Sequence, residues 1–195
     1  MVGHEADYDR FLASCAHQLP RRYHFHVLES YSDPVARLIQ PTQMQSMIRM
    51  GLDRKDYQAR AIDFDRPIHR LGHRDTAAIM ALYSHYPDNF FEPYQLETGL
   101  YFGIRDEELG LCSIAGIHVI SQDHDVAVIG NFVTHPEMRG CGLSTACTGQ
   151  LLEALFDRVS LVALNVQSDN APAIRMYSNF GFRENNVFFE GRTGP

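Results

Sequence analysis

The chain has 195 residues, of which 45% are hydrophobic and 21% are charged, and its net charge is −7 at pH 7. This composition predicts one globular domain with room for a smaller appendage, and the acidic balance argues against a nucleic-acid-binding surface. Four cysteines without paired spacing indicate reduced thiols. No basic, apolar leader and no apolar run of about 20 residues is visible, so we expect a soluble, cytoplasmic protein without a membrane segment.

The first third of the chain has a weak pattern. We expect residues 1–64 to form an N-terminal extension or subdomain and residues 65–195 to form the main domain. A helix is predicted over 7–18, extended segments over 23–28 and 35–39, and a helix over 43–50. The stretch 53–65 is polar and charged, which is typical of a passage between two parts of a chain.

The pattern becomes regular from residue 66. It predicts a short strand over 67–71, a helix that Asp75 caps and that ends before Pro87, and a second short helix over 90–96. Two strand-like runs, 100–104 and 111–120, are expected to form a hairpin, and a further apolar strand follows over 126–134.

The last third alternates helices and strands. After a glycine-rich turn, an i+4 stripe predicts an amphipathic helix, made of Leu143, Cys147, Leu151 and Leu155. A buried strand over 161–166, a helix capped by Asn170 and ended by Gly181, and a last strand over 182–189 follow. Antiparallel strands first and a strand–helix–strand crossover later predict a mixed sheet of the α/β (α+β) class.

The turn at 139–144, Arg-Gly-Cys-Gly-Leu-Ser, lies between an apolar strand and the amphipathic helix. A glycine-rich turn that opens a helix directs unpaired backbone N–H groups and the positive end of the helix dipole toward one point. This favours an anion site, and the phosphate of a nucleotide-like cofactor is the natural occupant. The alternative is a structural loop without a ligand.

Two further features strengthen that interpretation. Gly130 lies inside the preceding strand, where glycine often marks a bulge that frees backbone groups for an extended ligand. Asn170 and Tyr177 are seven residues apart, so they share a helix face about 10 Å apart, and the Tyr177 phenol could donate a proton there. A core aromatic is the alternative for Tyr177.

Two motifs, the turn at 139–144 and the segment from Asn170 to Tyr177, resemble in kind and order two motifs of the GNAT superfamily of acetyl-CoA-dependent N-acetyltransferases. The acyl-CoA loop of that family, Arg/Gln-x-x-Gly-x-Gly/Ala, matches Arg139 and Gly142, with Ser144 in the place of the last small residue. The second motif, an asparagine and then a tyrosine before Gly-Phe, matches Asn170 and Tyr177. The stretch 99–136 is similar to glycine-N-acyltransferase-type members. The resemblance implies the GNAT acyl-CoA N-acyltransferase fold, a central mixed sheet flanked by helices.

The resemblance also implies residue roles around acetyl-CoA as co-substrate. Backbone N–H groups of the loop would hold its pyrophosphate, and the backbone of the preceding strand would pair with its pantetheine arm. The implied cofactor-binding residues are Phe132, Val133, Thr134, Arg139, Gly140, Cys141, Gly142, Leu143, Ser144, Asn165, Asn170 and Tyr177. Tyr177 would protonate the leaving thiolate, so the Cys141 side chain is not expected to act as a nucleophile.

The residue that deprotonates the acceptor is less well defined by the sequence. His118, which by strand alternation shares a face with Ile114 and Gly116, is favoured. Glu97 precedes the first hairpin strand, could reach the acceptor cleft and is second, whereas the neutral side chain of Asn131 cannot act as a base. A structural role for His118 is the alternative. The pairs His24/His26 and His69/His73 lack the further ligands of a metal site, so we expect no metal.

We therefore expect an N-acetyltransferase that moves an acetyl group from acetyl-CoA to a primary amine of a small molecule or amino acid by direct attack. The alternative is a non-catalytic acyl-CoA-binding sensor or regulatory domain. A nucleotide-binding protein ranks last, since no lysine follows the glycines. The expected partner is a small-molecule amine. We expect no binding to nucleic acid or to a membrane, and a homodimer is one possible oligomeric state.

Overall fold

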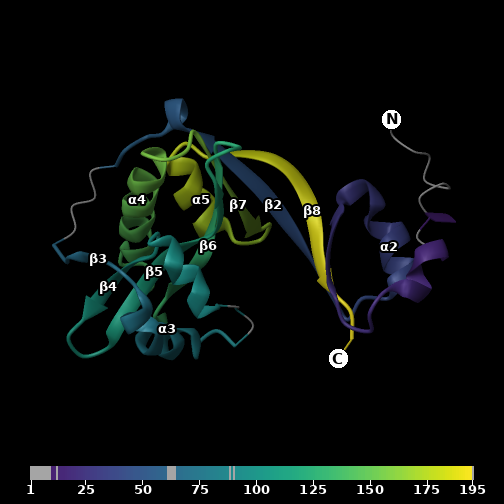
Figure 1. Cartoon of the computed structure of the whole chain (residues 1–195), viewed down its shortest axis with the longest axis horizontal. Coiled ribbons are helices and arrows are strands. Elements are labelled where there is room, and N and C mark those ends of the chain that lie inside the picture. The colour runs from purple at the N-terminus through teal and green to yellow at the C-terminus, as the bar shows by residue number, and fades with distance from the viewer. Residues whose placement is uncertain (1–9, 12, 61–64, 88, 90, 195) are drawn as a thin grey trace. The chain divides into compact units, whose positions relative to one another are not determined.

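The computed structural model describes residues 10–11, 13–60, 65–87, 89 and 91–194 (Figure 1). The chain forms two compact units, and neither is a single continuous segment. Unit 1 comprises Met1–Met50, Asn165–Ala173 and Glu184–Pro195, and unit 2 comprises Gly51–Leu164 and Ile174–Arg183. Among the described residues, none of the helices has both the length and the apolar character that crossing a membrane requires.

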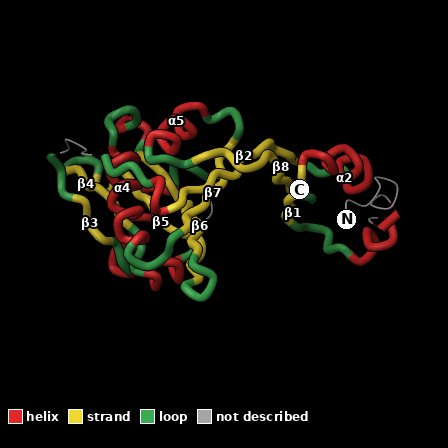
Figure 2. The backbone as a smooth tube through the Cα atoms, turned by 90° about the horizontal axis from the view of Figure 1, so that it is seen from above, coloured by secondary structure: helices red, strands yellow, loops and turns green. Residues whose placement is uncertain are grey.

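The strands form a mixed sheet in the order β1-β8-β2-β7-β6-β5-β4-β3. Figure 2 shows the strands in yellow and the helices in red. Their bounds are β1 His24–Leu28, β2 Gln43–Asp53, β3 Ile68–Arg70, β4 Phe102–Asp106, β5 Gly110–Ser121, β6 Val126–Thr134, β7 Leu161–Gln167 and β8 Arg183–Arg192. The helices are α2 Ser32–Ile39, α3 Thr76–Tyr83, α4 Leu143–Phe156 and α5 Ala171–Asn179. The predicted mixed α/β class is confirmed.

Unit 2 contains most of the hydrophobic core. The hairpin of β4 and β5, the antiparallel pairing of β5 with β6 and the parallel pairing of β6 with β7 agree with the predicted elements. Helix α4 runs along β4, β5 and β6, and its predicted stripe is confirmed, because its four residues are at most 2% exposed: Leu143, Cys147, Leu151 and Leu155. This packing holds the start of α4 beside the end of β6.

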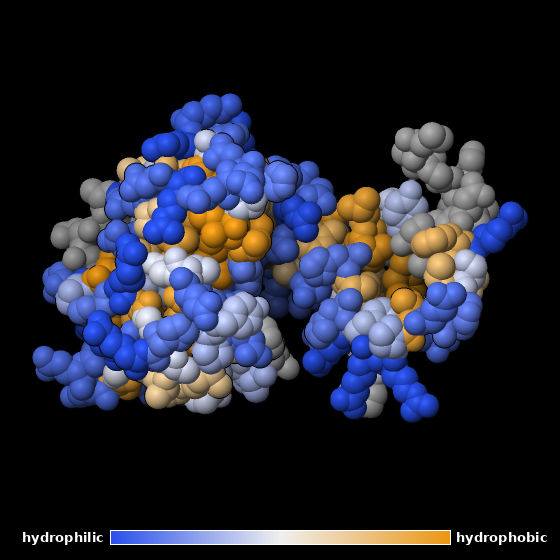
Figure 3. Space-filling view, viewed as in Figure 1, coloured by the Kyte–Doolittle hydropathy of each residue, from blue (hydrophilic) through white to orange (hydrophobic). Residues whose placement is uncertain are grey.

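Unit 1 is smaller, and its strand β1 pairs antiparallel with β8. It exposes four large apolar side chains, Phe11, Leu19, Leu28 and Leu38. Figure 3 shows hydrophobic colour on the surface around β1 and α2. Fewer core side chains are therefore available to stabilise unit 1 than unit 2.

Two predicted elements of unit 1 are wrong. Residues 35–39 belong to helix α2 and not to an extended segment, because Pro34 suits the first turn of a helix and is buried with Val35. Residues 43–50 belong to the 11-residue strand β2 and not to a helix. Ile48, Met50 and Leu52 are buried at every second position, and this strand period prevails over the helix propensity of methionine and glutamine.

Smaller differences occur at three other predicted helices. Asp75 directly precedes α3, but its carboxylate does not cap that helix; it accepts from the Gly72 N–H at 2.8 Å and from Arg105 Nη2 at 2.7 Å. The short helix predicted over 90–96 is a 3-10 helix, Pro93–Thr98, and Phe90 lies outside the described residues. Of the helix predicted over 7–18, residues 7–9 and 12 lie outside them, and its end is the 3-10 turn Ala16–Gln18.

Candidate active site

The turn at 139–144 is open and exposed. Gly140 and Gly142 both have φ of +78°, a conformation that glycine adopts without strain, and a Cβ at either position would meet no atom within 4 Å. Helix α4 begins directly after Gly142, which offers no capping side chain. The predicted glycine turn at a helix start is therefore confirmed as a structure.

The backbone donors of this turn have no protein partners. Within the described part of the chain, no hydrogen-bond acceptor faces the N–H groups of Gly140, Cys141 or Gly142. The first N–H groups of α4 lie next to them, and they also lack a side-chain cap. The Cys141 side chain is exposed, and its thiol lies 3.8 Å from the Arg139 carbonyl oxygen. The arrangement fits an anion such as a pyrophosphate, bound by backbone groups.

The Arg139 side chain does not point into this turn but to Tyr86. Its Nε and Nη2 atoms lie 3.2 and 2.8 Å from the Tyr86 hydroxyl oxygen, and its guanidinium lies over the ring, 5.3 Å from the centroid. The Tyr86 hydroxyl in turn donates to the carbonyl of Thr134, the last residue of β6. The sequence pattern did not predict this role of Tyr86, which joins the end of β6 to the turn.

Strand β6 contains a bulge just before the turn. Ile114 pairs with Val133 and Gly116 pairs with Gly130, so that Asn131 and Phe132 together stand opposite one residue of β5. Asn131 has a φ of 58°, which is unusual outside glycine. The bulge predicted at Gly130 is therefore confirmed, with its extra residue one position later.

On its other edge, β6 pairs in parallel with β7 over three residues of unit 2. The parallel ladder joins Val126–Val128 to Leu161–Ala163, so residues 129–134 stand outside it in the part of unit 2 that the structure describes. This segment includes Phe132, Val133 and Thr134, the residues expected to bind an extended ligand. Strand N–H and C=O groups that no neighbouring strand uses can pair with an amide-bearing ligand in the manner of an added strand.

Two facing glycines make room for two side chains on one face of the sheet. A Cβ at Gly130 would lie 1.9 Å from Nε2 of His118, and a Cβ at Gly116 would lie 2.2 Å from the Tyr101 ring. Because the two glycines pair across β5 and β6, these Cβ positions are on the same face. The exposed imidazole of His118 therefore lies over Gly130, next to the bulge. Glu97 is exposed on the 3-10 helix Pro93–Thr98.

Tyr177 lies on α5 and is only 5% exposed. Its ring contacts Phe132 and Phe182 edge-on, with centroids 5.6 and 5.7 Å apart. Burial raises the pKa of its hydroxyl above the usual value, so the phenol is protonated at neutral pH. Among the described residues the hydroxyl has no hydrogen-bond partner. The structure thus brings the predicted acid into contact with Phe132, beside the bulge.

Asn165 and Asn170 belong to unit 1, and the side-chain oxygen of each accepts a hydrogen bond from a residue of that unit. The Asn170 side-chain oxygen accepts from the Ala173 N–H at 3.2 Å, so the predicted cap of α5 is confirmed. The Asn165 oxygen accepts from Arg49 Nε at 3.1 Å. Their roles in binding a cofactor stay predictions.

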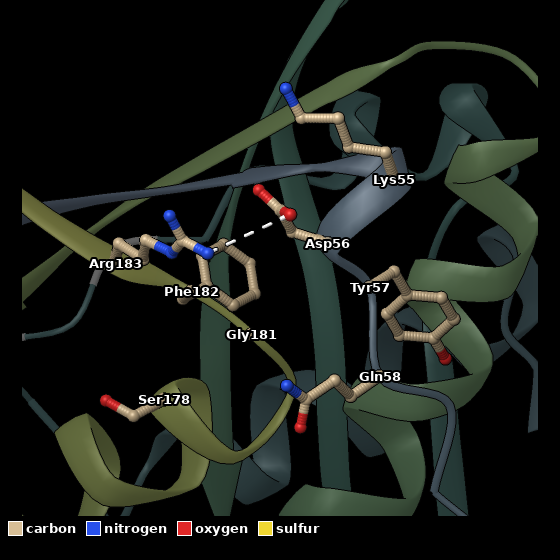
Figure 4. A pocket seen from close by; sticks show the side chains of 8 residues that line it. All are labelled: Lys55, Asp56, Tyr57, Gln58, Ser178, Gly181, Phe182 and Arg183. Atoms are coloured by element: carbon tan, nitrogen blue, oxygen red, sulfur yellow. Dashed lines mark ion pairs between the residues drawn. The ribbon is translucent and has the colours of Figure 1, made fainter.

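A pocket of about 420 Å³ lies in unit 2 at the junction of α5 and β8 (Figure 4). Lys55 and Arg183 bring positive charge to it, and Asp56 points toward Arg183 at 3.8 Å. Its wall includes Phe182, whose ring contacts Tyr177. The sequence pattern did not predict this pocket. Among the described residues, no three His, Cys, Asp or Glu side chains gather where a metal could bind.

Comparisons with solved structures give the same fold. The chain is similar to a protein described as a GNAT-family acetyltransferase from Novosphingobium aromaticivorans, with 22% identity, a TM-score of 0.67 and coverage of 79% of this chain and 66% of that one. A Drosophila protein has 16% identity and a TM-score of 0.72, over 94% and 66% of the two chains. A GCN5-related N-acetyltransferase from Kribbella flavida has 14% identity and a TM-score of 0.70, over 98% and 77%. This chain thus spans about two thirds of the length of the first two.

No curated protein matches the chain. The family model described as "Acetyltransferase (GNAT) family" matches residues 68–182. That range contains the glycine turn, the bulge of β6 and Tyr177, and it is more than half of the sequence. The chain therefore belongs to the GNAT acetyltransferase family, whose members transfer acyl groups.

Proposed function

We propose that the protein is an N-acetyltransferase that transfers an acetyl group from acetyl-CoA to a primary amine of a small molecule or amino acid. The observation that carries the proposal is the continuity of the bulge in β6 with the open turn before α4. Within the described residues of unit 2, positions 129–134 stand outside the ladder of β6 with β7, the N–H groups of the turn face no acceptor, and only residues 135–138 separate the two segments. A ligand with amide groups and a phosphate group would use both.

The chain's own groups have distinct roles in this proposal. The backbone N–H groups of 139–144 bind the pyrophosphate, and the backbone of Phe132, Val133 and Thr134 holds the pantetheine arm. Bound acetyl-CoA supplies an activated acyl group. N–H groups of β6 stabilise the negative charge that develops on the acyl oxygen, and the two substrates are held for direct attack.

Proton transfer involves Tyr177 and a base. The Tyr177 hydroxyl is protonated and without a partner among the described residues, so it can donate a proton to the leaving sulfur. His118 lies over Gly130 beside the bulge, which favours it over Glu97 as the group that takes a proton from the amine. The imidazole is suited to this because its usual pKa lies near neutrality.

Calorimetry with acetyl-CoA, and thiol release from acetyl-CoA with glycine, lysine, benzylamine and 1,4-diaminobutane, test the proposal. Binding with turnover of at least one amine is expected. Protein that binds no acetyl-CoA would refute it, and binding without transfer to any amine would favour the sensor alternative.

The turn itself is tested by a matched pair of glycine substitutions. Gly142→Asp places a carboxylate where the phosphate would bind, and Gly110→Asp makes the same change in the hairpin between β4 and β5. Both glycines have similar positive φ, 78° and 72°, and open space around a Cβ. We expect the Kd for acetyl-CoA to rise about tenfold or more in Gly142→Asp alone, because two negative charges then compete for the same donors. Equal affinities in the two variants would contradict this role.

A further inference from the structure

Asn131 occupies the extra position of the bulge, and its side chain belongs to a polar cluster with Tyr101 and Gln95. The Asn131 Nδ2 atom lies 2.6 Å from the Tyr101 hydroxyl oxygen and 3.2 Å from Gln95 Oε1. Tyr101 is completely buried and Gln95 is 6% exposed, whereas the Asn131 residue is half-buried. The cluster therefore connects the core of unit 2 with the surface of the bulge.

Counting protons fixes the orientation of the Asn131 amide. Tyr101 has one hydroxyl proton and donates it to the Ile117 carbonyl at 3.0 Å, so its oxygen accepts from Asn131. The Gln95 oxygen also accepts, both from the Glu92 N–H and from Asn131. Both Asn131 N–H groups are thereby used. A flip of the amide would turn its oxygen toward two acceptor oxygens and lose both bonds.

The Tyr101 ring is tightly packed. Its ring occupies the space that a Cβ of Gly116 would take, and it packs edge-on against Phe91 with centroids 5.9 Å apart. Burial raises the pKa of its hydroxyl to about 12, so the proton needed for the bond to Ile117 is present at neutral pH. The Asn131 amide is consequently attached to a rigid group.

The side-chain oxygen of Asn131 is the part of its amide that these two hydrogen bonds leave available. Asn131 Oδ1 has no hydrogen-bond partner among the residues that the structure describes, and the residue is partly exposed. A carboxamide oxygen accepts hydrogen bonds and prefers donors that carry positive charge. It does not accept a proton outright, so it can bind a donor without competing with a base.

We propose that Asn131 Oδ1 binds the nitrogen of the acceptor amine, with Tyr101 and Gln95 as positioning residues. This inference rests on the proposed function. Asn131 directly precedes Phe132, the first residue proposed to hold the acyl donor, so the amine is bound next to the strand segment where it must attack. A neutral primary amine has two N–H groups, and one can bind Asn131 while the other is lost after attack. A neutral secondary amine has only one, so primary amines are the acceptor class.

The test is Asn131→Gly, because glycine adopts the positive φ of this position without strain. Gln40→Gly is the matched control: it also replaces an exposed carboxamide residue at positive φ, 46°, at the end of α2. With saturating acetyl-CoA and the panel amine of highest rate, we expect Asn131→Gly to raise KM for the amine about tenfold, or about 1.4 kcal/mol. The Kd for acetyl-CoA stays within about twofold, and Gln40→Gly matches wild type in both.

A double-mutant cycle separates positioning from general damage. Tyr101→Phe retains the ring and removes the bond to Asn131, so it raises KM for the amine by itself, about threefold. In the Asn131→Gly background it has no further effect on KM, because the group that it positions is gone.

Wild-type KM in Asn131→Gly, or additive effects of the two substitutions, would overturn the inference and leave the proposed function standing. Wild-type protein without acetyl transfer would instead refute the proposed function, and the inference with it.

Discussion

Replacing Tyr177 by phenylalanine removes one oxygen from a side chain that is 5% exposed, and it leaves the ring between Phe132 and Phe182. As the proton donor to the leaving sulfur, this hydroxyl contributes the usual factor of a general acid. We therefore expect kcat to fall about 10²- to 10⁴-fold, which is about 3–5 kcal/mol of barrier. The Kd for acetyl-CoA, measured by calorimetry, should remain near the wild-type value.

The free energy of unfolding of Tyr177→Phe is expected to rise or to stay unchanged. Tyr177 is 5% exposed, and its hydroxyl makes no hydrogen bond within the described residues, so Tyr177→Phe breaks no hydrogen bond there. Removal of the hydroxyl leaves the free energy of unfolding unchanged or raises it by about 1 kcal/mol. Urea denaturation and thiol release on the same preparations measure both quantities. A tyrosine that serves only the core would retain wild-type kcat, and that result would refute the assignment.

Tyr57→Phe is the matched control. The Tyr57 ring packs against Phe156 and Phe180 in the same unit, with centroids 5.1 and 6.5 Å apart. Tyr57 lines the pocket of Figure 4, and the variant loses the same atom from an aromatic cluster that includes neither the turn at 139–144 nor the bulge of β6. We expect wild-type kcat, and a fall as large as that of Tyr177→Phe would show that any hydroxyl loss from these aromatic clusters impairs turnover.

Tyr86→Phe removes the hydroxyl that joins Arg139 to the end of β6; we expect the Kd for acetyl-CoA to rise about threefold to tenfold by calorimetry, and an unchanged Kd would contradict a role in shaping the turn. Gly130→Ala places a Cβ 1.9 Å from Nε2 of His118, so the imidazole must leave. We expect kcat to fall about tenfold or more, and wild-type turnover would remove His118 from the candidate bases. Burial raises the pKa of Tyr101 from 10.0 to about 12. Its phenol thus ionises in the unfolded chain before it does in the folded one, and the free energy of unfolding falls as the pH rises from 10 to 12. Urea titrations should show a smaller fall in Tyr101→Phe, and an equal fall would exclude this group as the cause.

The elements of unit 2 were predictable because their signals are local. The stripe of α4, the apolar run of β5 and the alternation at the start of β6 depend only on residues within one element, and the glycines at 140 and 142 indicate the turn. Unit 1 was harder to predict. The sequence of β2 contains good helix formers, and only its neighbours β7 and β8 in the strand order decide that it is extended.

The candidate site was predictable only in part, for a related reason. Gly130 indicated the bulge, but the residue with positive φ is Asn131, and its amide is held by Tyr101, 30 residues earlier in the chain. The contact between Tyr86 and Arg139 spans 53 residues. Spacing along the chain contains no signal for pairs of this kind, since they arise from tertiary packing.

Helix α4 begins directly after Gly142, which offers no capping side chain, although serine, aspartate or asparagine at a cap position stabilises a helix by about a few tenths of a kcal/mol relative to glycine. The protein therefore forgoes local stability at the point where the anion is proposed to bind. An anion bound there would cap the helix itself and favour the folded state. At 100 times its Kd, such a ligand adds about 2.7 kcal/mol to the free energy of unfolding. Resistance to heat and to proteolysis would then depend on the concentration of the co-substrate.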